Sequence, residues 1–327
     1  MSNARRLVFD AFGKPTESLR LESFEPKPPQ TGEALVRVVA APINPADLNT
    51  IEGTYGFKPE LPFTPGIEGC GVVEQCPGGE FSPGAPVIFL ERALTWATHT
   101  TVPAASLFHI PAGIDPLQAA MLKVNPATAW QLLHGFENLN PGDWIVQNLG
   151  NSAVGRCVIQ LCRDLGFRSI SFVRDAAQAA ALTALGADHV FTDDDNGAAA
   201  AKDVLGGAKA ALAFNAVGGD SALRLMKLLR ESGTHITYGA MGRKPITLPN
   251  GLLIFQDIQI CGLWVTRWAD NAPRGEIHSV YQNLADRVAR GKLVQPVDRS
   301  FALENWSDAL ARLEAPDRSG KVLFSMV

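Results

Sequence analysis

The chain has 327 residues, of which 46% are hydrophobic and 19% charged, and its formal net charge is −4 at pH 7. At about 150 residues per domain, this length predicts two domains that can each bury a core. The slightly acidic balance argues against a general binder of nucleic acid or of anionic membranes. No apolar run approaches the roughly 18 residues of a membrane-spanning helix, so we expect neither nucleic acid nor a membrane as a partner.

The cysteines and the first residues bear on the location of the protein. The N-terminal residues lead directly into strand-like sequence, without the pattern of a signal or transit segment. The five cysteines show neither metal-ligand nor disulfide spacing, and an odd number suits a reducing compartment. We therefore expect a cytoplasmic protein.

The first third of the chain is rich in short apolar runs that are separated by proline and glycine. Residues 35–39, 68–73 and 85–90 have the composition of strands. Because short strands with frequent turns are typical of β structure, these residues predict a mostly β domain.

The pattern changes near residue 115. Asp115 followed by Pro116 predicts a capped helix, and a second short helix is expected over 127–133. From residue 141 onward, strands alternate with helices, among them an amphipathic helix over 154–165 and a helix over 221–229. Repeated strand–helix–strand units predict a parallel, doubly wound sheet with helices on both faces.

The last part of the chain returns to the character of the first domain. A helix is expected over 276–290 and a terminal strand over 320–325. We expect this tail to pack on the N-terminal domain. The chain is therefore predicted to be an α/β protein in which a domain of residues 120–264 is inserted into a domain formed by 1–119 and 265–327.

A glycine-containing turn joins the first strand and helix of the inserted domain. It spans 147–155 (QNLGNSAVG), with Ala153 at a place where a glycine is often found. Such a turn lets backbone N–H groups approach a pyrophosphate at the helix N-terminus, although a purely structural turn is the alternative. The cofactor-binding candidates in this turn are Asn148, Gly150, Asn151, Ser152, Ala153 and Val154.

The end of the next strand indicates which dinucleotide is bound. Arg174 follows the glycine turn by about twenty residues. A basic residue at this strand end suits the 2′-phosphate of NADP, whereas an acid suits the ribose 2′-hydroxyl of NAD. Arg174 therefore favours NADP, and the alternative is a solvent-facing Arg174 with Asp175 as the NAD contact.

Further segments complete a recognisable pattern. They are 43–49 (INPADLN), 53–56 (GTYG), 59–62 (PELP), 65–69 (PGIEG), 124–129 (VNPATA), 215–219 (NAVGG), 238–242 (YGAMG), 252–257 (LLIFQD) and 262–268 (GLWVTRW). With the glycine turn and the Arg174 strand end, they resemble the zinc-free branch of the medium-chain dehydrogenase/reductase superfamily, and more narrowly its mitochondrial-type 2-enoyl thioester reductases. The resemblance implies a GroES-like, mostly β catalytic domain, an inserted Rossmann-type domain, and NADPH as cofactor.

The positions that hold zinc in other members of the superfamily carry different residues here. Zinc needs cysteine, histidine or acidic ligands. Asn44 stands in place of the first cysteine, and Ile67 rather than histidine precedes Glu68. The six histidines are expected at surfaces or strand ends. We therefore expect no metal.

Reduction of an α,β-unsaturated thioester without a metal needs a hydride at the β-carbon and a donor for the charge that develops on the thioester oxygen. A hydroxyl is a suitable donor. Among the three tyrosines, Tyr55 lies in a loop of the first domain that is flanked by glycines. The resemblance implies that Tyr55 is the catalytic donor, and the alternative is an aromatic that anchors the turn.

The resemblance also implies roles for residues outside the glycine turn. Trp268 is expected to border the substrate and the nicotinamide, although an interface or core aromatic is an equal alternative. Lys321 is expected at the cofactor phosphates, with a solvated lysine as the alternative. The other cofactor-binding candidates are Asn44, Thr128, Tyr238, Met241, Phe255, Leu263, Trp264 and Val265.

The last apolar strand of the inserted domain, over 258–264, predicts the assembly state. In the superfamily this sheet edge often pairs with its copy, so a homodimer is expected. The predicted function is NADPH-dependent reduction of trans-2-enoyl thioesters of coenzyme A or acyl carrier protein. A quinone or enone reductase on the same fold and a non-catalytic NADPH-binding protein are the alternatives.

Overall fold

The computed structural model describes residues 4–111 and 113–326. The chain forms two compact units, the first from Met1–Val124 and Ala269–Val327, and the second from Asn125–Trp268. The junctions fall a few residues later than the expected boundaries. Within the described residues, no helix is long and apolar enough to cross a membrane.

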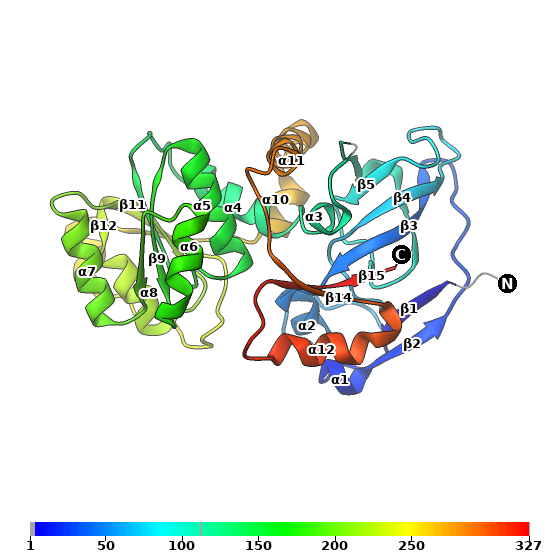
Figure 1. Ribbon diagram of the computed structural model, residues 1–327, viewed down its shortest axis with the longest axis horizontal. Helices are drawn as coiled ribbons and strands as arrows, with labels where there is room; N and C mark the ends of the chain where they lie inside the picture. Colours follow the sequence, from blue (N-terminus) through cyan, green and yellow to red (C-terminus); the bar gives the residue numbers. More distant parts are fainter. Residues whose placement is uncertain (1–3, 112, 327) are drawn as a thin grey trace. The chain divides into compact units, whose positions relative to one another are not determined.

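The first unit is built on a seven-stranded sheet. Six of its strands follow the order β14-β15-β3-β4-β5-β7, and the seventh, β6, pairs with β3. The terminal strand β15 pairs antiparallel with β3, so that Phe324 lies opposite Ala41 and the C-terminal tail shares a sheet with strands from the first third of the chain (Figure 1). The expected packing of the tail on the N-terminal domain is thus confirmed. The strands are β3 (Glu33–Pro42), β4 (Cys70–Gln75), β5 (Pro86–Phe89), β6 (His99–Pro103), β7 (Leu107–His109), β14 (Val297–Phe301) and β15 (Lys321–Ser325).

A two-stranded hairpin and several helices surround this sheet. The hairpin consists of β1 (Arg5–Phe9) and β2 (Leu19–Ser23). One apolar core lies between the hairpin, α2, α12 and β15, and its largest member is the fully buried Trp96. The helices are α1 (Pro15–Ser18), α2 (Pro45–Glu52), α3 (Pro116–Ala120), α11 (Arg274–Ala289) and α12 (Trp306–Glu314).

The second unit is a six-stranded parallel sheet with the order β10-β9-β8-β11-β12-β13. This is the Rossmann order. The strands after β8 are added on one side of it as far as β10, and from β11 onward they are added on the other side. Helices α4 and α5 cover one face, and α7 and α8 cover the other (Figure 1). The strands are β8 (Trp144–Gln147), β9 (Arg168–Val173), β10 (His189–Thr192), β11 (Ala210–Asn215), β12 (Leu229–Thr237) and β13 (Gln259–Gly262).

The helices of the second unit follow their local sequence signals. In α5, the Ser152 hydroxyl accepts a 3.0 Å hydrogen bond from the Gly155 N–H, and Gly166 closes the helix with φ +79°. The expected amphipathic helix is thus confirmed. The helices are α4 (Asn125–His134), α5 (Ala153–Leu165), α6 (Ala179–Leu185), α7 (Asp195–Leu205), α8 (Gly219–Met226) and α9 (Asn250–Gln256), and α10 (Val265–Asn271) crosses the junction.

Two expected helix ends were wrong. The helix expected to reach residue 229 ends at Met226, because Leu229 already pairs with Ala210 in the parallel sheet. The helix that begins after Asp115 was expected to reach residue 123. It is capped as expected, with the Asp115 carboxylate accepting from the Gln118 N–H at 3.1 Å, but it ends at Ala120. In the first case sheet pairing outweighs the helical pattern, since Leu229 is fully buried on the strand.

Candidate active site

The start of α2 places Asn44 inside the first unit. Asn44 is the N-cap, Pro45 takes the first helical position, and the Asp47 carboxylate accepts from the Asn44 N–H at 3.0 Å. The second oxygen of Asp47 accepts from the Ile67 N–H at 2.9 Å. Asp47 therefore ties the first turn of the helix to the segment that carries Glu68.

The side chain of Asn44 joins two buried charged groups. Its Nδ2 donates to Glu68 Oε1 at 2.8 Å, and its Oδ1 accepts from Lys321 Nζ at 2.6 Å. Lys321 Nζ also donates to the Ile43 carbonyl at 2.9 Å and is 8% exposed. The interpretation of Lys321 as a solvated lysine is therefore wrong, and its expected contact with cofactor phosphates stays a prediction.

A second lysine shares the surroundings of Glu68. Lys123 Nζ donates to the Ile67 carbonyl at 2.8 Å, and the Val124 N–H donates to Glu68 Oε2 at 2.8 Å. Burial raises the pKa of Glu68, and the charge of Lys321 opposes this effect. Burial lowers the pKa of Lys123 to about 8, with Glu68 as the main opposing charge. These groups form a buried network in which charges of both signs are compensated.

The loop that carries Tyr55 begins where α2 ends. Gly53 closes the helix with φ +74°, a conformation that favours glycine, and the Tyr55 N–H donates to the Asn49 carbonyl at 3.1 Å. Tyr55 is half-buried. Two residues further on, the ring of Phe57 lies under the guanidinium of Arg92, with 4.4 Å from Cζ to the ring centroid. The loop is therefore held at both ends of the short segment that presents the hydroxyl.

In the second unit, the turn between β8 and α5 is closely packed around its glycines. A Cβ on Gly150 would lie 2.7 Å from Ser171 Cβ, and one on Gly155 would lie 2.6 Å from the Gly150 carbonyl oxygen. Asn151 is exposed, and Ser152, Ala153 and Val154 are half-buried at the helix start. Backbone N–H groups at the start of this 13-residue helix suit a phosphate.

The side chain of Asn148 links the ends of β8 and β11, the two strands where the order of the sheet changes direction. Its Nδ2 donates to Asn215 Oδ1 and to Ser221 Oγ, both at 2.8 Å, and its Oδ1 accepts from the Ala216 N–H at 2.8 Å. Both donor hydrogens of the fully buried amide are thus engaged within the unit. This geometry fixes the carboxyl ends of β8 and β11, where dinucleotides bind in sheets of this order.

The two candidate contacts for the ribose, Arg174 and Asp175, differ in their surroundings at the end of β9. Arg174 is exposed, and within the described residues its guanidinium has no hydrogen bond or ion pair. Asp175 instead accepts from the Ala177 N–H at 2.9 Å and caps the following turn. The basic group is therefore available to a ligand, while one oxygen of the acid is engaged locally.

The remaining candidates of the second unit occupy varied environments. Tyr238 directly follows β12, and its hydroxyl is shielded from solvent beside Ser152, so burial raises the pKa of Tyr238. Met241 and Phe255 are exposed, and Thr128 is buried in the first turn of α4. The segment of half-buried residues that follows β13 contains Leu263, Trp264, Val265 and Trp268.

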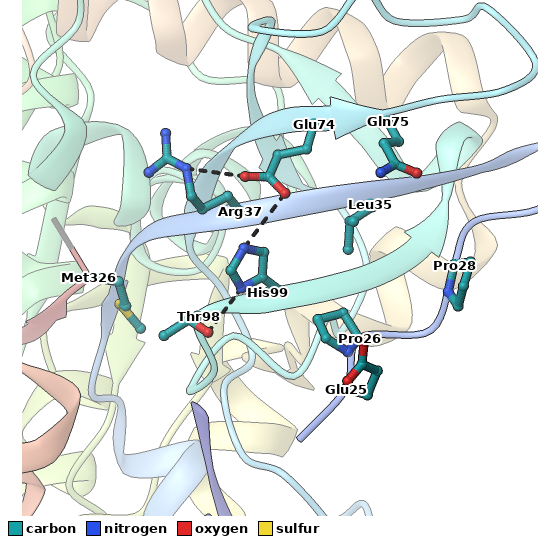
Figure 2. Close-up of a pocket in the computed structure, with 10 residues that line it drawn as sticks. All are labelled: Glu25, Pro26, Pro28, Leu35, Arg37, Glu74, Gln75, Thr98, His99 and Met326. Atoms are coloured by element: carbon teal, nitrogen blue, oxygen red, sulfur yellow. Dashed lines mark hydrogen bonds and ion pairs between the residues drawn. The ribbon is translucent and has the colours of Figure 1, made fainter. Parts of the chain in front are cut away.

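A pocket on the sheet of the first unit contains none of the expected site residues (Figure 2). In it the Glu74 carboxylate lies between Arg37 Nε at 3.5 Å and His99 Nε2 at 3.6 Å. It is lined by Glu25, Pro26, Pro28, Leu35, Arg37, Glu74, Gln75, Thr98, His99 and Met326. Partly exposed ion pairs of this kind contribute little free energy, and we assign the pocket no catalytic role.

Two family models match this chain, one in each part of it. The model of the alcohol dehydrogenase GroES-like domain matches residues 30–112, and that of the zinc-binding dehydrogenase matches residues 153–286. The mitochondrial enoyl-[acyl-carrier-protein] reductase of Xenopus tropicalis is 39% identical over 335 residues, covering 99% of this chain and 95% of its own. The chain belongs to the enoyl thioester reductase family of the medium-chain dehydrogenase/reductase superfamily. The resemblance found in the sequence is thus confirmed.

Solved structures share the fold of this reductase along nearly its whole length. The mitochondrial 2-enoyl thioester reductase heterodimer of Candida tropicalis has a TM-score of 0.90 at 29% identity, covering 99% of this chain and 100% of its own. The Etr1p complex with NADP and crotonyl-CoA has a TM-score of 0.89 at 28% identity, with the same coverage. A protein described as an NADPH:quinone reductase from Bacillus thuringiensis has a TM-score of 0.92 at 26% identity, covering 99% of both chains.

One of the matched domain descriptions names zinc, and the residues of this reductase do not fit that ion. Asn44 offers an amide oxygen that already accepts from the Lys321 ammonium, and both oxygens of Glu68 accept hydrogen bonds. A bound dication would lie beside this ammonium group. Among the described residues, no group of three histidine, cysteine or acidic side chains could hold a metal ion.

Two charged residues of this region were not found by sequence reasoning. Arg92 lies between β5 and β6, and Lys123 lies between α3 and α4. The available signal was a charged side chain within a largely apolar segment. Arg92 lies next to Glu91 in FLERALTW over 89–96, and Lys123 is the one charged residue of AAMLKV over 119–124. Such a signal does not name a partner, because partners are set by the tertiary fold.

Proposed function

We propose that this reductase uses NADPH to reduce the α,β double bond of trans-2-enoyl thioesters, with the hydride added at the β-carbon and a proton at the α-carbon. The observation that carries this proposal is the placement of Tyr55. It is a half-buried phenol on a loop held by Asn49 and Phe57, in a unit where Asn44 is hydrogen-bonded to Glu68 and Lys321. A phenol suits the charge that develops on a thioester oxygen.

The second unit supports NADPH as the cofactor. The tight turn at Gly150 and Gly155 leaves backbone N–H groups at the start of α5 for the pyrophosphate. The exposed Arg174 guanidinium suits the 2′-phosphate. When bound, NADPH supplies the hydride. Cofactor contacts are also proposed for Asn44, Thr128, Asn148, Asn151, Ser152, Ala153, Val154, Tyr238, Met241, Phe255, Leu263, Trp264, Val265 and Lys321.

Within this proposal, Tyr55 donates a hydrogen bond from Oη to the thioester oxygen as negative charge develops there. The donor is preorganised by the loop, so that little reorganisation is needed during the reaction. Trp268, in α10, borders the acyl chain and excludes water from the reacting carbons. The acyl group is carried by coenzyme A or by acyl carrier protein.

A quinone reductase is the second candidate, since the Bacillus thuringiensis protein of that description shares the fold. The deciding experiment follows NADPH oxidation at the nicotinamide absorbance band with a medium-chain trans-2-enoyl-CoA and, separately, with a simple quinone. We expect rapid oxidation with the thioester, reduced on the order of 10² to 10³-fold in Tyr55→Phe. Oxidation with the quinone alone would replace the proposal by the second candidate, and binding of NADPH without turnover would support a non-catalytic protein.

We further propose a homodimer formed along β13. This strand is the edge of the parallel sheet within the described residues, and three of its four residues are exposed. The neighbouring helix α9 adds Ile254 at 70% and Phe255 at 82% exposure. An exposed edge strand beside apolar side chains is a surface that pairing with a second copy would cover. The solved Candida tropicalis relative is a heterodimer.

We propose the cytoplasm as the location, on the basis of free thiols at all five cysteines. The curated relatives carry the word mitochondrial in their names, which makes the mitochondrion the alternative. Fractionation of the source cells with an antibody to this chain distinguishes the two locations.

A further inference from the structure

Arg92 is a half-buried cation whose charged group packs on an aromatic ring. It lies in the connection between β5 and β6. Its Cζ is 4.4 Å from the ring centroid of Phe57, which is a cation–π contact. Within the described residues, its guanidinium makes no hydrogen bond and no ion pair. A partly desolvated guanidinium without such partners loses part of its free energy of hydration.

The charges around Arg92 come from several elements of the first unit. Burial lowers the pKa of Arg92, whereas Asp47 on α2, Tyr55 in its ionised form and Asp270 on α10 favour its charged form. Lys123 is a further charge within reach, and Arg92 is one of the groups that lower the pKa of Lys123. The positive charge of Arg92 therefore acts on the phenol of Tyr55, which lies two residues before the ring that Arg92 covers.

We propose that Arg92 is a positioning residue for Tyr55: its guanidinium fixes the loop through the Phe57 ring and places a permanent positive charge beside the tyrosine hydroxyl. This inference rests on the proposed role of Tyr55. A nearby positive charge stabilises the electron-rich oxygen of a phenol that is donating its proton into a hydrogen bond. The same charge stabilises the developing negative charge of the thioester oxygen that the hydroxyl faces. Arg92 acts through Tyr55 and transfers no proton itself.

The tyrosine content of the chain allows a direct test. The chain has three tyrosines, and burial raises the pKa of Tyr238 and of Tyr281. The protein is labelled with 3-fluorotyrosine, whose phenol ionises at lower pH than that of tyrosine, and the three ¹⁹F resonances are followed as the pH rises. Tyr55→Phe identifies the resonance of Tyr55 by its loss.

Two variants of Arg92 separate the effect of its positive charge from the effect of its side-chain packing. In Arg92→Met, we expect the titration midpoint of the Tyr55 resonance to rise by about half a pH unit or more, because an opposite charge has been removed. Arg92→Lys keeps the charge and is expected to keep the midpoint within a few tenths of a unit. Arg290→Met removes an exposed cation of the same unit and is expected to change nothing. Arg92→Gln serves as the uncharged variant if the methionine variant does not fold by circular dichroism.

Enoyl-CoA turnover is measured on the same samples. We expect it to fall about tenfold in Arg92→Met and to recover largely in Arg92→Lys. An unchanged Tyr55 midpoint in Arg92→Met and Arg92→Gln would overturn the inference about Arg92, whatever the activities. Undiminished turnover in Tyr55→Phe would instead refute the proposed role of Tyr55, and the ¹⁹F titration would still report whether Arg92 acts on it.

Discussion

The amide of Asn44 lies between a carboxylate and an ammonium group, donating to Glu68 at 2.8 Å and accepting from Lys321 at 2.6 Å. Lys321 comes 277 residues after Asn44, so the terminal strand supplies the positive charge beside Asn44 and Glu68. The three side chains are buried. In this arrangement the ammonium of Lys321 compensates the charge of Glu68, which would otherwise be left in a medium of low dielectric constant.

Replacement of Lys321 tests this arrangement. In Lys321→Met, the Ile43 carbonyl and Asn44 Oδ1 lose a charged donor, and Glu68 loses a compensating charge. We expect the free energy of unfolding to fall by about 3 kcal/mol in chemical denaturation, since hydrogen bonds to buried charged groups are among the stronger ones. Lys202→Met, at an exposed position on α7, is the matched control, with an expected change below about 0.5 kcal/mol. Equal stabilities of the two variants would contradict this prediction.

Replacement of Arg174 tests the choice of cofactor. In Arg174→Ala, we expect the KM for NADPH to rise on the order of tenfold, because a charge-assisted contact with the 2′-phosphate is lost. The KM for NADH should stay within about twofold, since NADH lacks that phosphate. Steady-state kinetics with both cofactors gives the two values. Equal effects on NADPH and NADH would show that Arg174 has no part in the selection.

His235 predicts a specific loss of stability in acid. It is fully buried on β12, neither ring nitrogen has a hydrogen bond within the described residues, and burial lowers its pKa to about 4. The expectation that all histidines lie at surfaces or strand ends was therefore wrong for His235. The imidazole binds a proton below about pH 6.5 in the unfolded chain but only near pH 4 in the folded chain. The contribution of neutral His235 to the free energy of unfolding is therefore present above pH 6.5 and is lost as the pH falls toward 4.

The size of this effect follows from the two pKa values. Between pH 7 and pH 5, His235 should lower the free energy of unfolding by about 2 kcal/mol. His235→Leu removes the titrating group, so the difference in stability between the variant and the unmodified chain should change by that amount between the two pH values. Denaturant titrations at pH 7 and pH 5 provide the four free energies. A difference that does not vary with pH would exclude His235 as the acid-sensitive group.

The proposed dimer is tested at the centre of the edge strand. Ile260 on β13 is 40% exposed and pairs with His235 on one side only. Ile260→Lys adds a charge that would be buried by pairing with a second copy, so we expect a monomer in sedimentation analysis. Val204→Lys, an exposed apolar position on α7, is the control and should leave the assembly unchanged. A monomeric unmodified chain, or a dimer that survives Ile260→Lys, would refute this interface.

The sequence by itself determined the features that depend on local signals. The strand–turn–helix at Gly150, the caps at Asp115 and Ser152, and the helix end at Gly166 each follow from the conformational preferences of a few adjacent residues. The alternation of strands and helices was sufficient for the two-domain α/β fold. The position of Arg174 at the strand end after the glycine turn made it a candidate, and the family motifs then singled out Tyr55.

Only the tertiary structure decided which distant side chains meet. The surroundings of Lys321 and Arg92 depend on a terminal strand pairing with β3 and on a connection folding against the Tyr55 loop, which no local pattern encodes. The burial of His235 likewise depends on the place of β12 between β11 and β13, because Ala213 and Ile260 come beside it only when the three strands pair in the sheet. Charges and polar groups acquire shifted pKa values from such neighbours and from burial, and both are properties of the assembled fold.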